Sequence, residues 1–233
     1  LNVSGNSGSD VNDVTGNLSV TTQTNDACVS DISGVPTASE VGVGTQTTDT
    51  PATAPEPSLS YNRVLNAVDD LGMDDTGNTD ISGTLQTELE QGDTKIEFPA
   101  GQYLWSQTLD TVLVDGTGIV GLGDTREDVE FVFPDGFGGN CWETRYADGV
   151  ELRNVTIQQT MDDTTGVGML LRADDNLLIR DVHWDGYTPG QTEGAGRQVT
   201  ARIETTDGYG LIDNYYTDDG GPVGTYPDRS GGI

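Results

Sequence analysis

Two segments of this chain repeat one hydrophobic pattern 27 residues apart, at 149–157 and 176–184. Four positions are apolar in both copies: Val150 and Leu177, Leu152 and Ile179, Val155 and Val182, and Ile157 and Trp184. Arg153 and Arg180 are identical, and partial copies stand at 118–122 and 210–216. Strand-only repeats of roughly 20 to 50 residues are typical of β-solenoids, in which each coil buries its inward face only against stacked neighbours. The pattern therefore predicts a parallel β-helix.

The centre of each copy predicts a sharp corner between two short strands. Asn154 and Asp181 fall at this corner, where short amide and carboxylate side chains tolerate unusual backbone angles and hydrogen-bond locally. In stacked coils these residues would form a ladder. Only two copies are clear, so a coincidental repeat within a β-sandwich is the alternative.

The segment ahead of the repeats predicts one short helix among strands. Leu85 and Leu89 stand at helical spacing, and Ser82 is a candidate N-cap. The predicted elements are a strand at 61–70, a helix at 82–90, a strand at 94–98, a turn at 99–101 and a second strand at 103–105.

The stretch 70–105 resembles the N-terminal cap of pectate-lyase-like right-handed parallel β-helix proteins. The residues that carry the resemblance are Leu71-Gly72, Asp74-Asp75-Thr76-Gly77, Asn78-Thr79-Asp80, Phe98-Pro99-Ala100-Gly101 and Tyr103. Segments 118–124 and 131–136 resemble acidic β-helix proteins of haloarchaea, which are mostly exported. The resemblance covers about residues 61–233. It implies an all-β, right-handed parallel β-helix with a short N-terminal capping helix. It implies little about activity, because this scaffold carries lyases, glycoside hydrolases, epimerases, phage tail spikes and non-catalytic adhesins.

Composition divides the chain into three parts. Residues 1–44 are rich in Ser, Thr, Asp and Gly and predict an extended or small β-rich segment, and residues 45–60 form a Thr/Pro linker. The β-helix is predicted over 61–233 and is expected to continue beyond Ile233. No apolar run approaches the length of a membrane span, and the chain begins with Leu1 rather than Met, so a removed signal segment or missing upstream residues are expected.

Acidic residues outnumber basic ones by 39 to 10, which gives a formal net charge of −29, and Lys95 is the only lysine. Nucleic acids and anionic membranes need basic patches on their partners, so neither is an expected partner. Such a surface repels itself at low ionic strength but is screened at about 1 M salt. The charge therefore indicates a halophile, with an acidic secreted protein of ordinary salinity as the alternative.

Candidate catalytic residues are few. Converging carboxylates of a glycosidase could come from the pair Asp174 and Asp175, approached by Asp162 from a loop. A lyase needs a base, and Arg153, Arg172 and Arg180 are available, although Arg153 and Arg180 are expected to pair with neighbouring corner carboxylates.

No required cofactor is expected. The sequence also predicts at most weak, generic binding of Ca²⁺ or Mg²⁺ by the Asp-rich loops, with Asp162, Asp163, Asp174 and Asp175 as candidate ligands. His183 is the only histidine, which excludes sites built on several histidines. Cys28 and Cys141 form either one long-range disulfide or two independent thiols.

Aromatic rings concentrate towards the C-terminus and suit stacking on sugars. The candidate glycan contacts are Tyr187, Tyr209, Tyr215 and Tyr216. Trp184 stands at an inward repeat position and is expected in the core. The N-glycosylation pattern occurs at Asn2, Asn17 and Asn154.

The sequence as a whole predicts a non-catalytic structural or surface β-helix, located outside the cell, on the cell surface or on the virion of a halophilic archaeon. Its expected partners are carbohydrate or copies of itself in a surface assembly. The alternative is a polysaccharide lyase or glycoside hydrolase acting on an extracellular polysaccharide.

Overall fold

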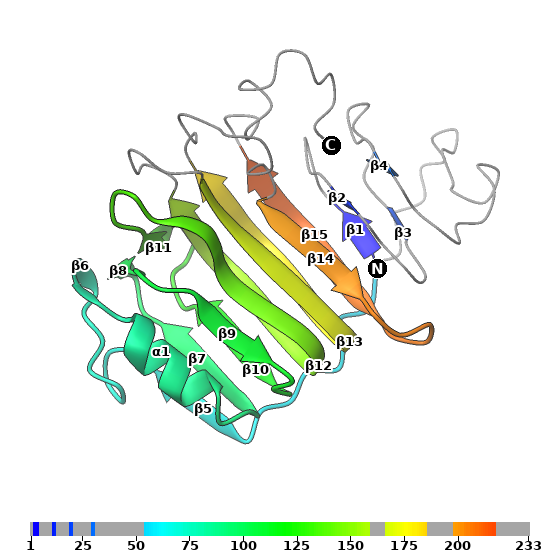
Figure 1. The fold of residues 1–233 in the computed structure, drawn as a ribbon, viewed down its shortest axis with the longest axis horizontal. Coiled ribbons are helices and arrows are strands. Elements are labelled where there is room, and N and C mark those ends of the chain that lie inside the picture. The colour runs from blue at the N-terminus through cyan, green and yellow to red at the C-terminus, as the bar shows by residue number, and fades with distance from the viewer. Residues whose placement is uncertain are drawn as a thin grey trace, which may run out of the picture.

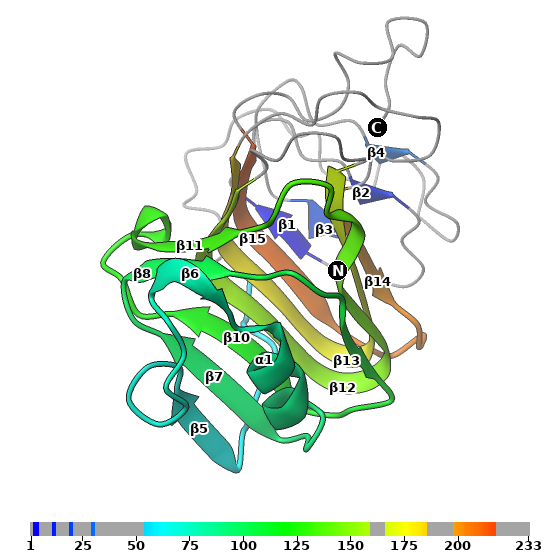
Figure 2. The same ribbon diagram turned by 60° about the vertical axis from the view of Figure 1, so that its left-hand side comes forward.

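A computed structural model describes residues 54–158, 166–185 and 198–217 in full, and the backbone of four short strands nearer the N-terminus. Strands dominate, and every strand pairing within them is parallel. The elements are β1 (Asn2–Ser4), β2 (Val11–Asn12), β3 (Ser19–Val20), β4 (Val29–Ser30), β5 (Arg63–Asn66), β6 (Thr76–Asp80), α1 (Ser82–Leu89), β7 (Thr94–Phe98), β8 (Gly101–Leu104), β9 (Leu109–Val112), β10 (Thr117–Gly121), the 3₁₀ turn η1 (Arg126–Asp128), β11 (Val129–Val132), β12 (Gly138–Gln158), β13 (Gly166–Asp185), β14 (Val199–Ile203) and β15 (Gly210–Thr217). The sheet is curled, with α1 at one end (Figures 1 and 2).

The chain visits three columns of strands in a fixed order. Column 1 stacks β5, β7, β10, 150–153 of β12, 177–180 of β13 and 210–213 of β15. Column 2 stacks β8, β11, 156–157 of β12, 183–184 of β13 and the end of β15. Column 3 stacks β9, 142–145 of β12, 169–173 of β13 and β14. Each passage from column 1 through column 2 to column 3 makes one coil.

The predicted repeat is confirmed in register. Val150 pairs with Leu177, Leu152 with Ile179, Val155 with Val182 and Ile157 with Trp184. The partial copies belong to the same column, since Ile119 pairs with Leu152 and Ile179 with Ile212. Coils of unequal length separate these copies, and this is why only two of them align clearly in the sequence.

The corner between columns 1 and 2 is a ladder of left-handed residues. Asn154, Asp181 and Asn214 have φ of 55°, 53° and 52°. Asn214 donates to the Asp181 carboxylate at 2.6 Å, and the Asn154 amide donates to the carbonyls of Gly121 and Gly123 at 3.0 and 2.8 Å. The ladder that the sequence predicts at Asn154 and Asp181 is therefore present, with Asn214 as a third member.

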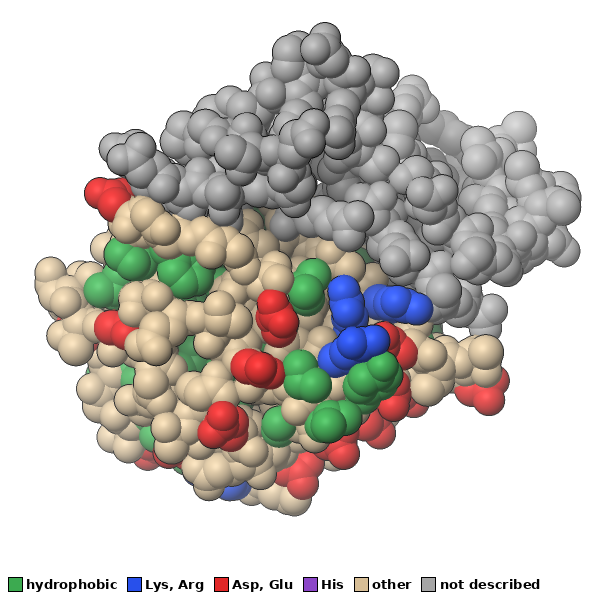
Figure 3. All heavy atoms as spheres, viewed as in Figure 1, with side chains coloured by type: hydrophobic (Ala, Val, Ile, Leu, Met, Phe, Trp, Pro, Cys, Tyr) green, Lys and Arg blue, Asp and Glu red, His purple; other side chains and the backbone are tan. Residues whose placement is uncertain are grey.

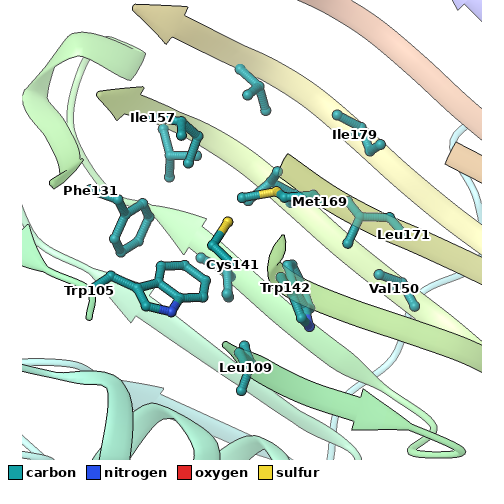
Figure 4. Close-up of a cluster of buried hydrophobic side chains, with 14 of the residues drawn as sticks. Trp105, Leu109, Phe131, Cys141, Trp142, Val150, Ile157, Met169, Leu171 and Ile179 are labelled. Carbon is teal, nitrogen blue, oxygen red and sulfur yellow. The ribbon is translucent and has the colours of Figure 1, made fainter. Parts of the chain in front are cut away.

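The core lies inside the curl and is rich in aromatic side chains (Figure 4). Trp105, Trp142 and Trp184 are fully buried, as expected for Trp184. Trp142 satisfies its indole N–H on the Thr111 hydroxyl at 2.9 Å. Phe131 packs edge-on against Trp105, with ring centroids 5.3 Å apart. Side chains of all three columns therefore meet in one core.

Helix α1 covers the core at the end near β7 and β9. Its buried face consists of Ser82, Leu85 and Leu89. The sequence predicts Ser82 as the N-cap, and this prediction is wrong. The helix already includes Ser82, and the cap position is Ile81. The Ser82 hydroxyl instead donates to Asp80 at 2.6 Å and accepts the backbone N–H of Ser106 at 2.8 Å. It thereby joins the helix to the chain that follows β8.

Residues 54–60, the described part of the predicted linker, pack on the outer face of column 1. The Glu56 carboxylate pairs with Arg180 and, at 3.5 Å, with Arg153. The backbone N–H of Ser58 donates to Asn176 at 3.0 Å.

At the other end of this segment, Lys95 lies over the Tyr61 ring. The pKa of Tyr61 is raised, mainly by burial and then by the charge of Glu151. Residues 54–61 therefore form a strap across the coils; the strand predicted at 61–70 is shorter, at Arg63–Asn66.

The N-terminal strands prolong the sheet beyond β15. β1 pairs with β15 and β3 pairs with β1, while β2 pairs with β4 and lies against β14 (Figure 1). These four strands are the described part of the segment 1–44, for which the sequence predicts an extended or small β-rich structure. The remainder of 1–53 and the segments 159–165, 186–197 and 218–233 lie outside the described residues, as does the predicted continuation beyond Ile233.

Candidate functional site

The acidic pair singled out from the sequence is part of a corner between columns 3 and 1. The Asp175 carboxylate accepts the backbone N–H groups of Asn176 at 2.8 Å and Tyr209 at 2.6 Å. The backbone carbonyl of Asp174 accepts the Thr205 hydroxyl at 2.6 Å. Asp162 and Asp163, which were expected to approach this pair, lie outside the described residues. The contacts of Asp175 hold two neighbouring coils together.

Arg180 and Arg153 are paired with carboxylates, but these lie on the strands and on the strap and not at the corner, where the sequence analysis expected them. Arg180 donates to Asp213 at 2.9 Å and pairs with Glu56 of the strap. Arg153 lies 3.7 Å from a carboxylate oxygen of Glu151. Both arginines face outward from column 1, whereas Asp174 and Asp175 precede that column. The structure therefore does not join Arg180 to the acidic pair.

The described residues contain no group of three or more His, Cys, Asp or Glu side chains that could hold a metal ion. Weak binding of Ca²⁺ or Mg²⁺ at Asp174 and Asp175 therefore stays a prediction. Cys141 is a free, buried thiol, and burial raises its pKa, while Cys28 lies outside the described residues.

The aromatic candidates separate into buried and accessible rings. Tyr215 is only 6 % exposed and belongs to the core, because it pairs with the inward residue Val182, so it offers no ring face to a glycan. Tyr209 is half-buried and donates its hydroxyl to the Pro55 carbonyl of the strap at 2.8 Å. Tyr216 is half-buried between His183 and Arg126, with centroid distances of 5.1 and 5.2 Å. Tyr187 lies outside the described residues.

Of the three glycosylation candidates, the structure describes the side chain of Asn154 only. The Asn154 amide makes both of its hydrogen bonds inside the corner, so its nitrogen is engaged in the folded protein. Asn2 begins β1, of which only the backbone is described, and Asn17 lies outside the described residues.

The outer face of column 3 carries a feature that the sequence analysis did not single out, a row of three arginines from neighbouring strands. Arg172 of β13 pairs in register with Arg202 of β14, and Arg145 of β12 stands opposite Arg172 at a break in the register. We call Arg145, Arg172 and Arg202 the arginine row. Figure 3 shows this face, where basic side chains gather beside hydrophobic ones.

Within the described residues, one carboxylate lies near two of these guanidinium groups, those of Arg145 and Arg202. Glu204, whose side chain is 8 % exposed, has one oxygen 3.8 Å from Arg145 Nε and 4.0 Å from Arg202 Nε. These distances exceed hydrogen-bond length. The Nε groups of Arg172 and Arg202 and the second oxygen of Glu204 are buried without a hydrogen-bond partner within the described residues. The arginine row therefore carries excess positive charge and unused donors.

Strained backbone presents apolar side chains beside the row. Arg145 and Tyr146 together oppose Arg172, which makes a β-bulge, and Tyr146 has a φ of 55°. This arrangement turns the Tyr146 ring outward, 45 % exposed, with the Arg145 guanidinium 4.6 Å from its centroid. Directly after the neighbouring strand β9, Leu113 has a φ of 64°, is 71 % exposed and donates its N–H to the Arg145 carbonyl. Bulges and left-handed non-glycine residues of this kind concentrate at functional sites.

This strain yields a prediction. Leu113→Asn should raise the free energy of unfolding by about 0.5–1 kcal/mol, because asparagine adopts the left-handed region at lower cost than leucine. Leu113→Val, which places a β-branched side chain there, should lower it. Urea titrations at one fixed high salt concentration measure both. Equal stability of the two variants would contradict the assigned strain.

The chain matches no protein-family model, no curated protein and no solved structure. Within the part of the chain that the structure describes, no helix is both long enough and apolar enough to cross a membrane. The function must therefore be argued from the site itself.

Proposed function

We propose that this chain is a right-handed parallel β-helix of a halophile, exported or carried on a virion, that acts as a non-catalytic structural or surface protein and contacts glycans. The three columns of parallel strands, visited in fixed order and closed at one end by α1, support the architecture. The acidic composition supports the saline habitat.

The proposed contact with glycans rests on one observation: some charged groups join neighbouring coils, whereas others face solvent. Asp175 and Arg180 are engaged in contacts that hold coils together. The side chains of Arg145 and Arg202, which are 45 % and 33 % exposed, and the exposed ring of Tyr146 instead form a solvent-facing surface. Amphipathic rings beside hydrogen-bond donors suit contact with sugars.

A polysaccharide lyase is the second candidate. Arg172 favours it, because this arginine makes no ion pair within the described residues and a lyase requires a base beside its substrate. A glycoside hydrolase would need converging carboxylates, and the described contacts of Asp175 are to backbone amides.

Incubation with acidic and neutral polysaccharides at high salt tests the proposal. We expect glycan to be retained by the immobilised protein, with no new reducing ends and no absorbance of unsaturated uronate. Product that forms with the native chain and disappears in Arg172→Gln would establish the lyase instead. Failure to retain any glycan would refute the glycan contact.

A further inference from the structure

We propose that the arginine row binds the carboxylate of an acidic sugar, with Tyr146 stacking on the sugar ring. This deepens the proposed function and rests on it. Arg172 and Arg202 are the anchors of the carboxylate, and Arg145 holds the Tyr146 ring from behind.

Charge gives the first argument. The chain has 39 acidic and 10 basic residues, yet three basic residues lie side by side on one face, and among the described residues Glu204 is the carboxylate within 4.0 Å of two of them. In such a chain an arginine can be paired with an acidic side chain at little cost in composition, as Arg63, Arg153 and Arg180 are. Arg172 has no such partner within the described residues. An anionic ligand would supply the missing charge.

The geometry of adjacent strands gives the second argument. Arg172 and Arg202 are direct cross-strand partners, and parallel strands lie about 4.8 Å apart. Two guanidinium groups at this spacing can both donate to one carboxylate, and arginine donors bind carboxylates strongly. Without an anion the same spacing places like charges side by side, which destabilises a sheet. The pair is therefore best explained by an anion between or above its heads.

The surroundings favour a sugar acid over a bare ion. Tyr146, Leu113 and Val112 are 45 %, 71 % and 37 % exposed, and all three adjoin Arg145. A small inorganic anion would use none of this apolar surface. A sugar ring has apolar faces that cover an aromatic ring while its carboxylate reaches the arginines.

Acidic side chains limit the ligand on one side. Two positions earlier along the same strands, Asp110 of β9 pairs with Glu143 of β12, while Leu170 of β13 pairs with Thr200 of β14. The acidic pair lies over β9 and β12 and would repel a carboxylate. The neutral pair continues the strands that carry Arg172 and Arg202. We therefore expect the carboxylate to lie over β13 and β14 and the sugar ring to extend towards β12.

Binding of a hyaluronan octasaccharide, of its methyl ester and of polyglutamate tests the inference by calorimetry. The measurement is made at the lowest salt at which the protein keeps its far-UV circular dichroism spectrum, because salt screens charge pairs. We expect the native chain to bind the free acid at least about tenfold more tightly than the ester, a difference equivalent to about 1.4 kcal/mol.

The variants separate the roles. Arg172→Gln and Arg202→Gln should each weaken binding of the acid at least about tenfold and leave binding of the ester unchanged, whereas Tyr146→Ala should weaken both. Arg153→Gln is the matched control: it removes the same charge from a side chain that is 35 % exposed, against 33 % for Arg202, but lies on column 1. It should change neither Kd more than about twofold. If Arg172→Gln fails to fold, Arg202→Gln alone carries the test, because Arg202 is the second anchor and its side chain is 33 % exposed.

Each remaining outcome overturns part of the account. Equal binding of acid and ester, unaffected by Arg202→Gln, would refute the carboxylate site but leave the glycan contact standing. Polyglutamate binding as tight as the glycan would show that the row recognises acidic protein. Displacement of the glycan by equimolar free sulfate would show a general anion site. Absence of binding by any saccharide would refute both this inference and the proposed function.

Discussion

Gly121→Ala is expected to unfold the protein or to lower its free energy of unfolding by more than about 3 kcal/mol. A Cβ at this position would lie 2.0 Å from the backbone carbonyl oxygen of Asn154. That carbonyl cannot shift easily, because the Asn154 side chain is fixed by the Gly121 and Gly123 carbonyls and its strand is paired on both sides. Thermal and urea unfolding at high salt measure the loss.

Gly83→Ala provides the control. Gly83 lies in α1 and a Cβ there meets nothing within 4 Å, so alanine should raise stability by up to about 1 kcal/mol through helix propensity. If Gly121→Ala were as stable as the native chain, the close approach of the β10 end to the Asn154 corner would be wrong.

Molar salt should stabilise the native chain by at least about 3 kcal/mol relative to low salt, a rise in the melting temperature of about 6–12 °C. The cause is the net charge of −29, which includes exposed carboxylates such as Asp69, Asp70 and Asp75 that follow one another closely in the cap. Screening shortens the range of their repulsion to about 3 Å at 1 M salt.

Sucrose at matched osmolality is the control for this experiment, because it favours burial without screening charge. Potassium chloride should stabilise the protein far more than sucrose does. An unchanged melting temperature between low and molar potassium chloride would refute the assignment to a saline habitat.

The parts of the fold that repeat could be predicted from the sequence. The 27-residue offset aligns Leu152 with Ile179 because these inward positions must fill the same core, and each copy carries the left-handed corner residue that the turn requires. The strand at 94–98 was equally clear, since period-two alternation persists through it. In all three cases one local pattern agrees with the final packing.

The strap and the closing strands could not be predicted, because their partners are remote in sequence. Glu56 pairs with Arg180, and β1 pairs with β15, through contacts that no local pattern encodes. The role of Ser82 was also not predicted: the helix begins one residue earlier than a Ser82 cap would allow, and the Ser82 hydroxyl accepts the backbone N–H of Ser106, which belongs to a later segment.

The candidate site was predicted only in part. Arg172 was named as an available base, but its neighbours on the sheet were not recognised. A signal existed, since Arg145 and Arg172 share the 27-residue offset that also relates Arg153 and Arg180. No such signal exists for Arg202, because the coil that carries it is not related to its neighbour by the same 27-residue offset. The Asp174-Asp175 pair was also named as a candidate, and its described contacts are those of a corner between coils.

The affinity of the folded chain for one acidic oligosaccharide, compared between Asp175→Asn and Arg202→Gln, tests the central claim most directly. Asp175→Asn should lower stability, because the Asn176 and Tyr209 N–H groups lose a charged acceptor, yet should leave the Kd within about twofold. Arg202→Gln should not lower the melting temperature, because it removes one of two neighbouring like charges, and should lose at least about tenfold in affinity. The reverse result, with binding lost in Asp175→Asn and kept in Arg202→Gln, would place the function at the acidic corner and contradict the account.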